Sequence, residues 1–402
     1  MTDNRAMERR QRLCILGATG SVGMNTLEVV ARHPERFEVF ALTARHRIDE
    51  LAALCERWRP RLAVVDNAAQ ARSLRERLGR ADVPTEVLHG AAALSELAAH
   101  PDVDTVMAAI VGAAGLAPCL AAARAGKRLL LANKEALVVG GGLFMRCVQE
   151  GNATLLPIDS EHSAIFQCLP SDRASWPRRV DHIVLTASGG PFRERDLKSL
   201  DSVSPQEACA HPNWVMGRKI SVDSATMMNK ALEVIEARWL FALAPAQIRV
   251  VIHPQSIVHS MVVYRDQSVL AQLGTPDMKA PIACGLAWPE RIDSGAPRLD
   301  FAALGPLSFE AADARRFPGL GLAYDCLDAA PGATNVLNAA NEIAVAAFLE
   351  GVIRFPAIHA VNAATLEQVA GDFGKQDTLD DLLSLDARAR AVALQHVKAR
   401  AR

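Results

Sequence analysis

Hydrophobic residues in the first 160 positions form short runs separated by stretches of helical period. Short apolar runs are typical of buried strands, and apolar residues three and four positions apart are typical of helices. The pattern predicts strands at 12–16, 37–42, 62–65, 105–110, 128–131 and 154–157, with helices that include 22–32, 49–57 and 68–78. Strands that alternate with helices in this way indicate an α/β fold built on a parallel sheet.

The pattern changes near residue 161. A long polar loop now separates the predicted elements, which are strands at 182–188, 249–252, 257–264 and 268–273 and a helix at 225–241. Residues 289–318 are richer in Pro, Gly and Asp, and the stretches 337–351 and 356–402 are helical in pattern. We therefore predict a central α+β domain and a small helical domain at the C-terminal end.

Composition narrows the class of protein. A chain of 402 residues is too long for one ordinary core, and half of its residues are hydrophobic. The 44 Lys and Arg residues nearly balance 45 Asp and Glu residues, which argues against a nucleic-acid or membrane-surface partner. The eight cysteines are scattered without metal-binding pairs, and we see neither a signal-peptide core nor an apolar run of about twenty residues. We expect a soluble, cytoplasmic protein.

A glycine-rich turn, GATGSVG at 17–23, follows the first predicted strand. Glycines at this point let the backbone approach a pyrophosphate, and the free N–H groups of the next helix bind it. Thr19 and Ser21 add hydroxyl donors. Because tight turns also use glycine for purely structural reasons, the position after the first strand of an alternating domain is what favours a dinucleotide site.

Basic residues follow the second predicted strand. An NAD site would place an acidic residue about twenty positions after the glycines. This chain instead has Arg45, His46 and Arg47, which suit a ribose 2′-phosphate. The stretch therefore favours NADPH, and a solvated basic loop is the alternative.

Two carboxylates, Asp159 and Glu161, lie at the end of the last strand of the predicted parallel sheet. In extended backbone, side chains two residues apart share a face. Adjacent carboxylates repel each other unless a cation lies between them, and a hard divalent ion satisfies both. We interpret the pair as metal ligands, with an acidic loop of no further role as the alternative.

The stretch 221–241 supplies further polar candidates. Ser224 lies where the predicted helix begins, and Asn229, Lys230 and Glu233 have spacings that let them share a helix face. The hydroxyl, amide and ammonium groups suit phosphate oxygens, and Glu233 suits a metal ion. An exposed Lys–Glu pair on a helix surface has the same spacing.

Two loops complete the set of candidates. Ser188, Gly189 and Gly190 follow a predicted strand and form a possible anion-binding turn. His211 and Trp214 lie in a polar loop with Pro and Gly, which we interpret as a lid over a ligand. The alternative for Trp214 is a buried anchor of an ordinary loop.

Taken together, these segments resemble the 1-deoxy-D-xylulose 5-phosphate reductoisomerase family over essentially the full chain. The resemblance is carried by seven motifs: GATGSVG, LLLANKEALV (129–138), PIDSEHSAIFQ (157–167), TASGGPFRE (186–194), the block 211–241, IHPQSIVHSMV (252–262) and LNAANEIAVAAF (337–348). It implies an NADPH-dependent enzyme that rearranges and reduces a sugar phosphate, with Mg²⁺ or Mn²⁺ as the metal and Co²⁺ as an alternative. It also implies a homodimer.

The resemblance implies a role for each matched residue. Thr19, Gly20, Ser21, Val22, Asn133, Glu135 and Gly217 would contact NADPH, together with Arg45, His46 and Arg47. Asp159, Glu161 and Glu233 would bind the metal. The substrate would contact Lys134, Ser160, Glu161, Ser188, His211, Trp214, Ser224, Asn229, Lys230 and Glu233. Lys134, His211 and the three metal ligands would form the catalytic set.

The resemblance also implies the reaction and the domain boundaries. The substrate skeleton would rearrange by retro-aldol cleavage and re-addition, and NADPH would reduce the resulting aldehyde. We expect a Rossmann-like NADPH domain at 1–158, a catalytic domain at 159–288 with a flexible loop at 208–218, a linker at 289–318 and a helical domain at 319–402. One departure is Arg45, because family members commonly have glycine there.

Three other functions compete with this interpretation. Short-chain reductases use similar glycine turns, but their Tyr-x-x-x-Lys motif is missing, because Tyr264 and Tyr324 are followed four residues later by Ser268 and Asp328. Other NADP-dependent dehydrogenases share a three-domain layout but do not explain the PIDSEHS motif together with the 211–241 block. A non-catalytic NADPH sensor has no need for three carboxylates beside a phosphate site.

Overall fold

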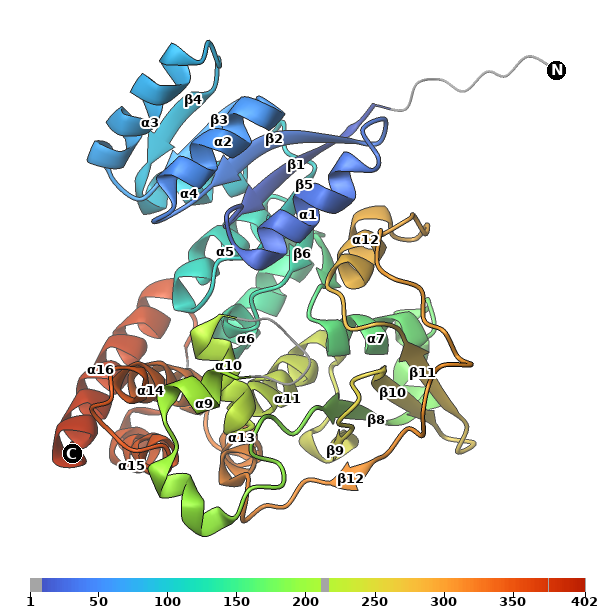
Figure 1. Cartoon of the computed structure of the whole chain (residues 1–402), viewed down its shortest axis with the longest axis vertical. Coiled ribbons are helices and arrows are strands. Elements are labelled where there is room, and N and C mark those ends of the chain that lie inside the picture. The colour runs from blue at the N-terminus through green and yellow to red at the C-terminus, as the bar shows by residue number, and fades with distance from the viewer. Residues whose placement is uncertain (1–8, 211–216, 375, 402) are drawn as a thin grey trace. The chain divides into compact units, whose positions relative to one another are not determined.

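The computed structural model describes residues 9–210, 217–374 and 376–401, and their contacts divide the chain into two compact units (Figure 1). The first unit contains the residues up to Asn133, Arg146–Asp159 and Met278–Ala296. The second contains Lys134–Met145, Ser160–Asp277 and Pro297–Arg402. The chain therefore alternates between the units, and α6 (Glu135–Glu150) begins in the second and ends in the first.

The first unit is built on a seven-stranded parallel sheet with the strand order β4-β3-β2-β1-β5-β6-β7. The strands are β1 (Gln11–Leu16), β2 (Phe37–Thr43), β3 (Leu62–Val65), β4 (Glu86–His89), β5 (Thr105–Ala108), β6 (Arg128–Leu131) and β7 (Thr154–Pro157). The predicted parallel α/β architecture is confirmed. We did not predict β4, because it is a short edge strand with Glu86 and His89 exposed.

Five helices in the described part of this unit follow its strands as the alternating pattern predicts, and a sixth comes from a later part of the chain. They are α1 (Ser21–Ala31), α2 (Ile48–Trp58), α3 (Ala68–Arg80), α4 (Gly90–Ala98), α5 (Leu116–Arg124) and, later in the chain, α12 (Lys279–Ala287). The central strand β1 is buried, with Leu13, Cys14, Ile15 and Leu16 all at most 1% exposed. Burial on both faces explains why this strand is continuously apolar rather than alternating.

The second unit contains a mixed five-stranded sheet with the order β11-β10-β8-β9-β12. Its strands are β8 (Val180–Ala187), β9 (Ile248–Ile252), β10 (Val258–Tyr264), β11 (Val269–Leu273) and β12 (Glu310–Ala311). Strands β8 and β9 are parallel, whereas the other pairs are antiparallel. The short strand β12 lies inside the segment 289–318, which we expected to be a linker.

The remaining helices all belong to the second unit. They are α7 (Ser160–Cys168), α8 (Trp176–Arg179), α9 (Pro205–Cys209), α10 (Arg218–Ala225), α11 (Met228–Phe241), α13 (Pro318–Asp328), α14 (Ala333–Leu349), α15 (Ala357–Val369) and α16 (Leu379–Ala399). Short 3₁₀ turns lie at Ala113–Gly115, Arg173–Ser175, Leu197–Ser202, Pro245–Gln247 and Ala370–Asp372. Among the described residues, no helix is both long and apolar enough to span a membrane.

The helix predicted at 225–241 is wrong in its first residues. The chain forms two helices, α10 and α11, with Met227 between them in a left-handed conformation (φ 61°). The Thr226 hydroxyl donates to the Val222 carbonyl at 3.1 Å and accepts from the Met228 N–H at 3.3 Å. A side chain that bonds nearby backbone groups in this way competes with continued helix. Ser224 therefore lies in the last turn of α10 and not at a helix start.

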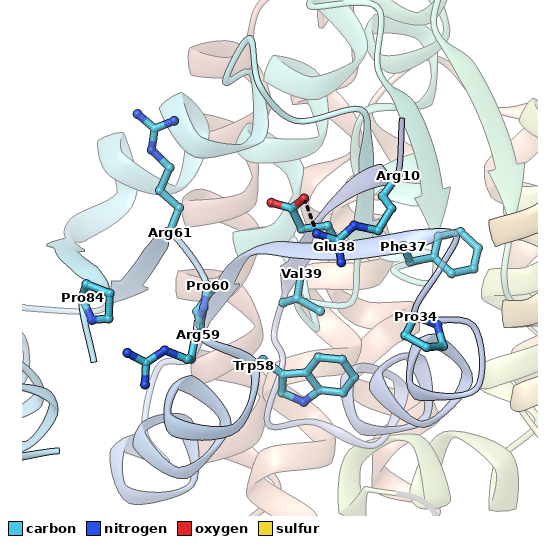
Figure 2. A pocket seen from close by; sticks show the side chains of 10 residues that line it. All are labelled: Arg10, Pro34, Phe37, Glu38, Val39, Trp58, Arg59, Pro60, Arg61 and Pro84. Atoms are coloured by element: carbon cyan, nitrogen blue, oxygen red, sulfur yellow. Dashed lines mark hydrogen bonds and ion pairs between the residues drawn. The ribbon is translucent and has the colours of Figure 1, made fainter. Parts of the chain in front are cut away.

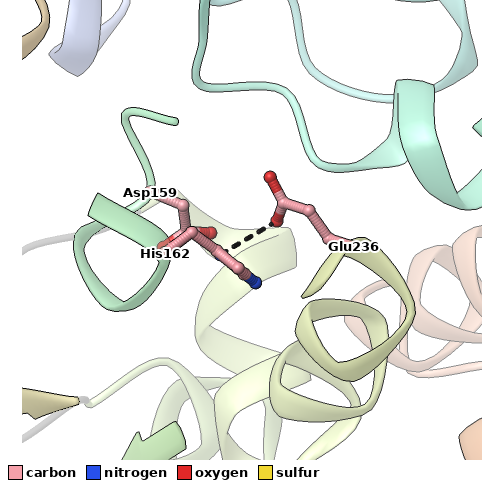
Figure 3. Close-up of side chains that lie close together, drawn as sticks. All are labelled: Asp159, His162 and Glu236. Atoms are coloured by element: carbon pink, nitrogen blue, oxygen red, sulfur yellow. Dashed lines mark ion pairs between the residues drawn. The ribbon is translucent and has the colours of Figure 1, made fainter. Parts of the chain in front are cut away.

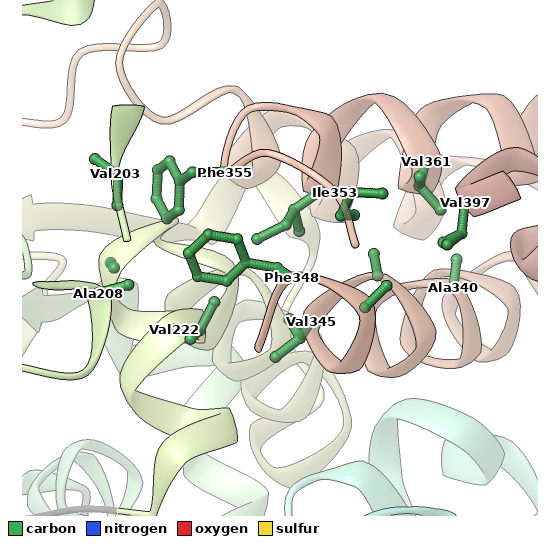
Figure 4. Close-up of a cluster of buried hydrophobic side chains, with 14 of the residues drawn as sticks. Val203, Ala208, Val222, Ala340, Val345, Phe348, Ile353, Phe355, Val361 and Val397 are labelled. Atoms are coloured by element: carbon green, nitrogen blue, oxygen red, sulfur yellow. The ribbon is translucent and has the colours of Figure 1, made fainter. Parts of the chain in front are cut away.

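An apolar cluster joins α10 to the C-terminal helices (Figure 4). Val222 from α10 packs in the same cluster as Val345 and Phe348 from α14 and Val361 from α15. Burying a side chain such as Phe348 contributes about 1.5–3 kcal/mol to stability. The C-terminal helices therefore form one core with the helix that carries Ser224.

Candidate active site

The carboxyl ends of several strands of the parallel sheet form one edge of the first unit. The turn Thr19, Gly20, Ser21 and Val22 joins β1 to α1, and Gly20 is the residue directly before the helix. The backbone N–H of Ala18 donates to the Thr43 carbonyl at 2.8 Å, so the turn lies beside the end of β2. A pyrophosphate at this helix N-terminus would meet unpaired N–H groups.

Close backbone packing explains two glycines of the turn. Gly17 has φ +84°, and a Cβ there would lie 2.8 Å from the Ala109 carbonyl oxygen. A Cβ at Gly23 would lie 2.5 Å from the Gly17 carbonyl oxygen. The turn therefore excludes side chains at both positions, as the glycine pattern predicts for a dinucleotide site.

The three basic residues are exposed directly after β2. The Arg45 guanidinium lies 3.5 Å from the Asp66 carboxylate, and Arg47 pairs with Glu50 at 3.1 Å. Arg45 is not among the described residues with positive φ, so the backbone accepts a side chain where family members commonly have glycine. His46 is exposed beside them. The guanidinium groups of Arg45 and Arg47 are available to an anionic ligand at the same edge as the glycine turn.

Asn133 follows β6 and is buried. Its amide donates to the carbonyls of Ile110, just after β5, and of Gly112, the latter at 3.2 Å. The loops after β5 and β6 are thereby held together at the carboxyl edge of the sheet. Parallel sheets bind their ligands at this edge.

A surface pocket of about 470 Å³ lies at the opposite, amino edge of the same sheet (Figure 2). Its lining includes Phe37 at the start of β2 and Arg61 just before β3. Arg10 pairs there with Glu38 at 3.4 Å, and Arg61 pairs with Asp102 at 3.1 Å. None of the residues predicted to bind NADPH lines this pocket.

A compact cluster of charged side chains forms in the second unit. The Lys230 ammonium on α11 lies 2.8 Å from the Glu161 carboxylate on α7 and also pairs with Glu233. The Lys134 ammonium, just before α6, lies 3.1 Å from Glu233 and 2.9 Å from the Asn229 carbonyl oxygen. The structure thus brings together residues that lie nearly 100 positions apart in the sequence.

The prediction that Asp159 and Glu161 lie on one face of extended backbone is wrong. Ser160 and Glu161 form the first turn of α7 and are not extended backbone. Asp159 directly precedes this helix and is joined to it by one peptide bond. Carboxylate oxygens of Asp159, Glu161 and Glu233 all lie within 4.8 Å of one another. Helix geometry and not strand alternation therefore sets the spacing of this group.

The neighbouring carboxylates determine the charge of Lys230. Burial would lower the pKa of Lys230, but the carboxylates of Glu161 and Glu233 outweigh that effect and raise it. The ammonium therefore stays protonated at neutral pH. The buried carboxylate of Glu233 and the partly buried carboxylate of Glu161 are stable side by side because two lysines neutralise them.

A buried His–Glu pair, His162 and Glu236, lies on the same two helices as the charged cluster (Figure 3). The His162 Nδ1 atom lies 3.3 Å from the Glu236 carboxylate, and its Nε2 atom lies 2.9 Å from the Glu233 carbonyl oxygen. His162 thereby ties α7 to α11. Ligand atoms of Asp159, His162 and Glu236 also lie within 4.8 Å of one another. We did not predict a role for His162 or Glu236, although each lies within three positions of a predicted metal ligand.

The serine turn after β8 approaches the end of α10. Gly189 and Gly190 have φ +82° and +66°, and the Gly190 N–H donates to the Ser188 hydroxyl at 3.2 Å. A Cβ at Gly190 would lie 2.6 Å from the Ser224 carbonyl oxygen. The turn with Ser188 therefore packs against the backbone of Ser224, as an anion site shared by both serines requires.

The remaining candidates are Gly217, Glu135, His211 and Trp214. Gly217 is the exposed residue directly before α10. Glu135 begins α6 and is buried. His211 and Trp214 lie outside the described residues.

Comparisons with known proteins identify the same family in successive segments of the chain. Residues 13–141 match the model for 1-deoxy-D-xylulose 5-phosphate reductoisomerase, and residues 155–241 and 273–392 match two models for C-terminal domains of that enzyme. The curated 1-deoxy-D-xylulose 5-phosphate reductoisomerase of Aromatoleum aromaticum is 62% identical, and the alignment covers 98% of this chain and 97% of that protein. The one from Ralstonia nicotianae is 60% identical over 96% of this chain and 98% of its own length.

Solved structures show the same similarity. A crystal structure of DOX-P reductoisomerase in complex with NADPH, fosmidomycin and magnesium has a TM-score of 0.94 and 47% sequence identity, and covers 96% of this chain and 98% of that chain. The 1-deoxy-D-xylulose 5-phosphate reductoisomerase from Zymomonas mobilis in complex with NADPH has a TM-score of 0.90 and 43% identity, and covers 98% of this chain and 100% of that chain.

Proposed function

Because this chain belongs to the 1-deoxy-D-xylulose 5-phosphate reductoisomerase family, we propose that it converts 1-deoxy-D-xylulose 5-phosphate to 2-C-methyl-D-erythritol 4-phosphate with NADPH and a divalent metal ion. This is a step of non-mevalonate isoprenoid biosynthesis. The observation that carries the proposal is the cluster in which Lys134 and Lys230 contact Glu161 and Glu233. The family resemblance assigns Lys134, Glu161 and Glu233 to the reacting part of the site and Lys230 to the substrate phosphate.

Asp159, Glu161 and Glu233 would hold the metal ion. Their carboxylates offer the hard oxygen ligands that Mg²⁺ and Mn²⁺ prefer, and their spacing allows one ion to reach all three. When bound, the metal supplies Lewis-acid polarisation of substrate oxygens, and NADPH supplies the hydride that reduces the rearranged aldehyde. The magnesium in three related crystal structures supports the proposal that a divalent metal binds to this chain.

Lys134 would stabilise the negative charge that develops on the substrate during the reaction. The Lys134 ammonium is almost fully buried, so a hydrogen bond from it to a developing oxyanion acts at low local dielectric. Ser160, in the first turn of α7, would contact the same end of the substrate. His211, Trp214 and the loop around them would cover it and exclude water.

The phosphate group would bind between the serine turn and the helices. Ser188 and Ser224 come from segments that pack together, and Asn229 and Lys230 are neighbours on α11. Hydroxyl, amide and ammonium groups are the donors that a phosphate dianion needs. The bound fosmidomycin in a related structure supports a site for a compound of this kind.

NADPH would bind at the carboxyl edge of the parallel sheet. Thr19, Gly20, Ser21 and Val22 would bind the pyrophosphate, and Arg45, His46 and Arg47 would bind the 2′-phosphate. Asn133, Glu135 and Gly217 would contact the rest of the cofactor. The domain at 1–158 would thus bind the cofactor, the domain at 159–288 would carry the chemistry, and the protein would act as a cytoplasmic homodimer.

An assay of NADPH oxidation tests the proposal. The purified chain, with Mg²⁺ or Mn²⁺ and 1-deoxy-D-xylulose 5-phosphate, should consume NADPH and form one equivalent of the branched product. Removing the metal with a chelator should abolish turnover, and adding the ion back should restore it. Folded protein that binds NADPH but consumes none with this substrate would be a cofactor sensor or another dehydrogenase, and the proposal would be rejected.

A further inference from the structure

Lys219 lies between two buried carboxylates in the second unit. It is the second residue of α10, and its ammonium lies 2.9 Å from Asp223, one helical turn later. The same ammonium lies 3.1 Å from Glu135, the first residue of α6. The carboxylate side chains are only 1% and 9% exposed. Lys219 is therefore a cationic link between two helices.

The C-terminal helices contact Asp223, one of the two carboxylates that pair with Lys219. The Asn341 amide on α14 donates to the second oxygen of Asp223 at 2.7 Å. The Asn362 amide on α15 donates to the Asn341 carbonyl oxygen at 3.2 Å. Asn341 and Asn362 are completely buried. A polar chain thus runs from α15 through α14 and α10 to the start of α6.

The residues next to this chain are those that the proposed function places on the substrate. Lys134 directly precedes Glu135, and Ser224 directly follows Asp223. We propose that Lys219 is a positioning residue. Through its ion pairs with Glu135 and Asp223, it holds the neighbouring residues Lys134 and Ser224 where they contact the substrate. The inference rests on the proposed function, because it concerns the affinity for that substrate.

The positive charge of Lys219 stabilises the close approach of the Glu135 and Asp223 carboxylates. Burial would raise the pKa of Glu135, but the Lys219 ammonium, a backbone hydrogen bond and the Lys134 ammonium together lower it, and the charge of Lys219 contributes most to this lowering. Without Lys219, the ionised carboxylates of Glu135 and Asp223 would face each other without the cation that now lies between them. Buried like charges repel strongly, so α10 and the first turn of α6 would separate. Lys134 and Ser224 would shift with them.

The first experiment compares Lys219→Met with Lys398→Met, which removes an exposed lysine from α16. We expect Lys219→Met to raise the KM for 1-deoxy-D-xylulose 5-phosphate on the order of tenfold or more and to lower kcat, because small displacements of positioning groups cost this much. Lys398→Met should match the wild type. Lys219→Arg, which keeps the cation, should lie closer to the wild type than Lys219→Met.

A second pair of variants separates positioning from stability. Asn341→Leu removes the hydrogen bond to Asp223 without changing any charge. Asn338→Leu removes an equally buried asparagine from the same helix, whose amide donates to Glu342 at 3.2 Å. Both variants should lower the thermal unfolding midpoint. Only Asn341→Leu should also raise the KM for the substrate. This pair remains informative if Lys219→Met does not fold.

The outcomes distinguish the two proposals. A wild type that turns over the substrate supports the proposed function, whatever the variants do. Variants at Lys219 and Asn341 that lose only thermal stability and keep wild-type KM and kcat would overturn the positioning role. An equal rise in KM for Asn341→Leu and Asn338→Leu would overturn it as well. A wild type that is inactive would overturn both proposals.

Discussion

Glu233 accepts hydrogen bonds from Lys134, Asn229 and Lys230, while its side chain is only 1% exposed. A buried carboxylate keeps its charge only when donors and cations compensate for lost water. The spacing of Asn229, Lys230 and Glu233 predicts a shared helix face, and the contacts confirm it. Spacing alone did not separate this face from an ordinary exposed Lys–Glu pair. Burial does.

Changing Glu233 to Gln should reduce turnover through loss of metal binding. The amide keeps the size of the side chain but removes the negative charge that would hold the ion. Calorimetric titration with Mn²⁺ should show weaker binding, while NADPH binding is unchanged. Glu367→Gln, on the exposed face of α15, is the matched control. Full activity of Glu233→Gln at limiting metal would show that Glu233 is not a ligand.

Lys230→Met should strengthen Mn²⁺ binding in the absence of substrate. The Lys230 ammonium occupies the space between Glu161 and Glu233, so the metal ion must compete with it for these carboxylates. The same variant should bind 1-deoxy-D-xylulose 5-phosphate more weakly, because the proposed phosphate donor is lost. Calorimetry with each ligand separately measures both effects. Weaker binding of both ligands would contradict this competition.

Among the helices, α6 and α11 meet at a position where only glycine fits. The indole of Trp239 on α11 packs against Gly141, and a Cβ at Gly141 would overlap it. The backbone of α6 departs from helical geometry at the preceding residue, Gly140. Because α11 carries Lys230 and Glu233, this contact also helps to determine where the charged cluster lies.

Gly141→Ala should lower the free energy of unfolding by about 1–3 kcal/mol, the usual cost of overpacking. Gly142→Ala is the matched control, because its Cβ would lie 3.7 Å from the Trp239 ring, an ordinary contact. Alanine should stabilise that helical position by about 0.5–1 kcal/mol relative to glycine. Urea denaturation measures both changes. Equal effects of the two substitutions would show that the indole contact is unimportant.

At the scale of the whole molecule, the family resemblance implies a homodimer, and one exposed edge is suited to it. Strand β11 forms an edge of the five-stranded sheet, and Val269 and Leu270 on it are about half exposed. An exposed apolar edge strand is a common site of association between chains. We therefore place the proposed dimer contact at this edge.

Light scattering should give a molar mass of twice the 43.2 kDa chain. Leu270→Lys should shift the protein toward the monomer, because a charge at an edge strand opposes pairing. Leu394→Lys, which changes a similarly exposed leucine on α16, should leave the mass unchanged. A dimer that is equally stable in both variants would place the interface elsewhere.

Patterns over short stretches predicted much of this protein correctly. The apolar runs identified six of the seven strands of the parallel sheet, because buried parallel strands are continuously hydrophobic. The exposed edge strand β4 carries no such signal. The break between α10 and α11 was also missed, because it depends on how the Thr226 side chain bonds the backbone around it.

The sequence by itself determined the types of chemistry available and their order along the chain. The glycine turn, the basic stretch after β2 and the carboxylates Asp159, Glu161 and Glu233 are recognisable from residue type and spacing, and the family resemblance connects them to one reaction. The tertiary structure alone decided that Lys134 and Lys230 neutralise Glu233, and that Lys219 links Glu135 to Asp223. The contacts of Lys134 with Glu233 and of Lys219 with Glu135 join segments far apart in the chain, and all four contacts depend on burial, which spacing along a sequence does not reveal.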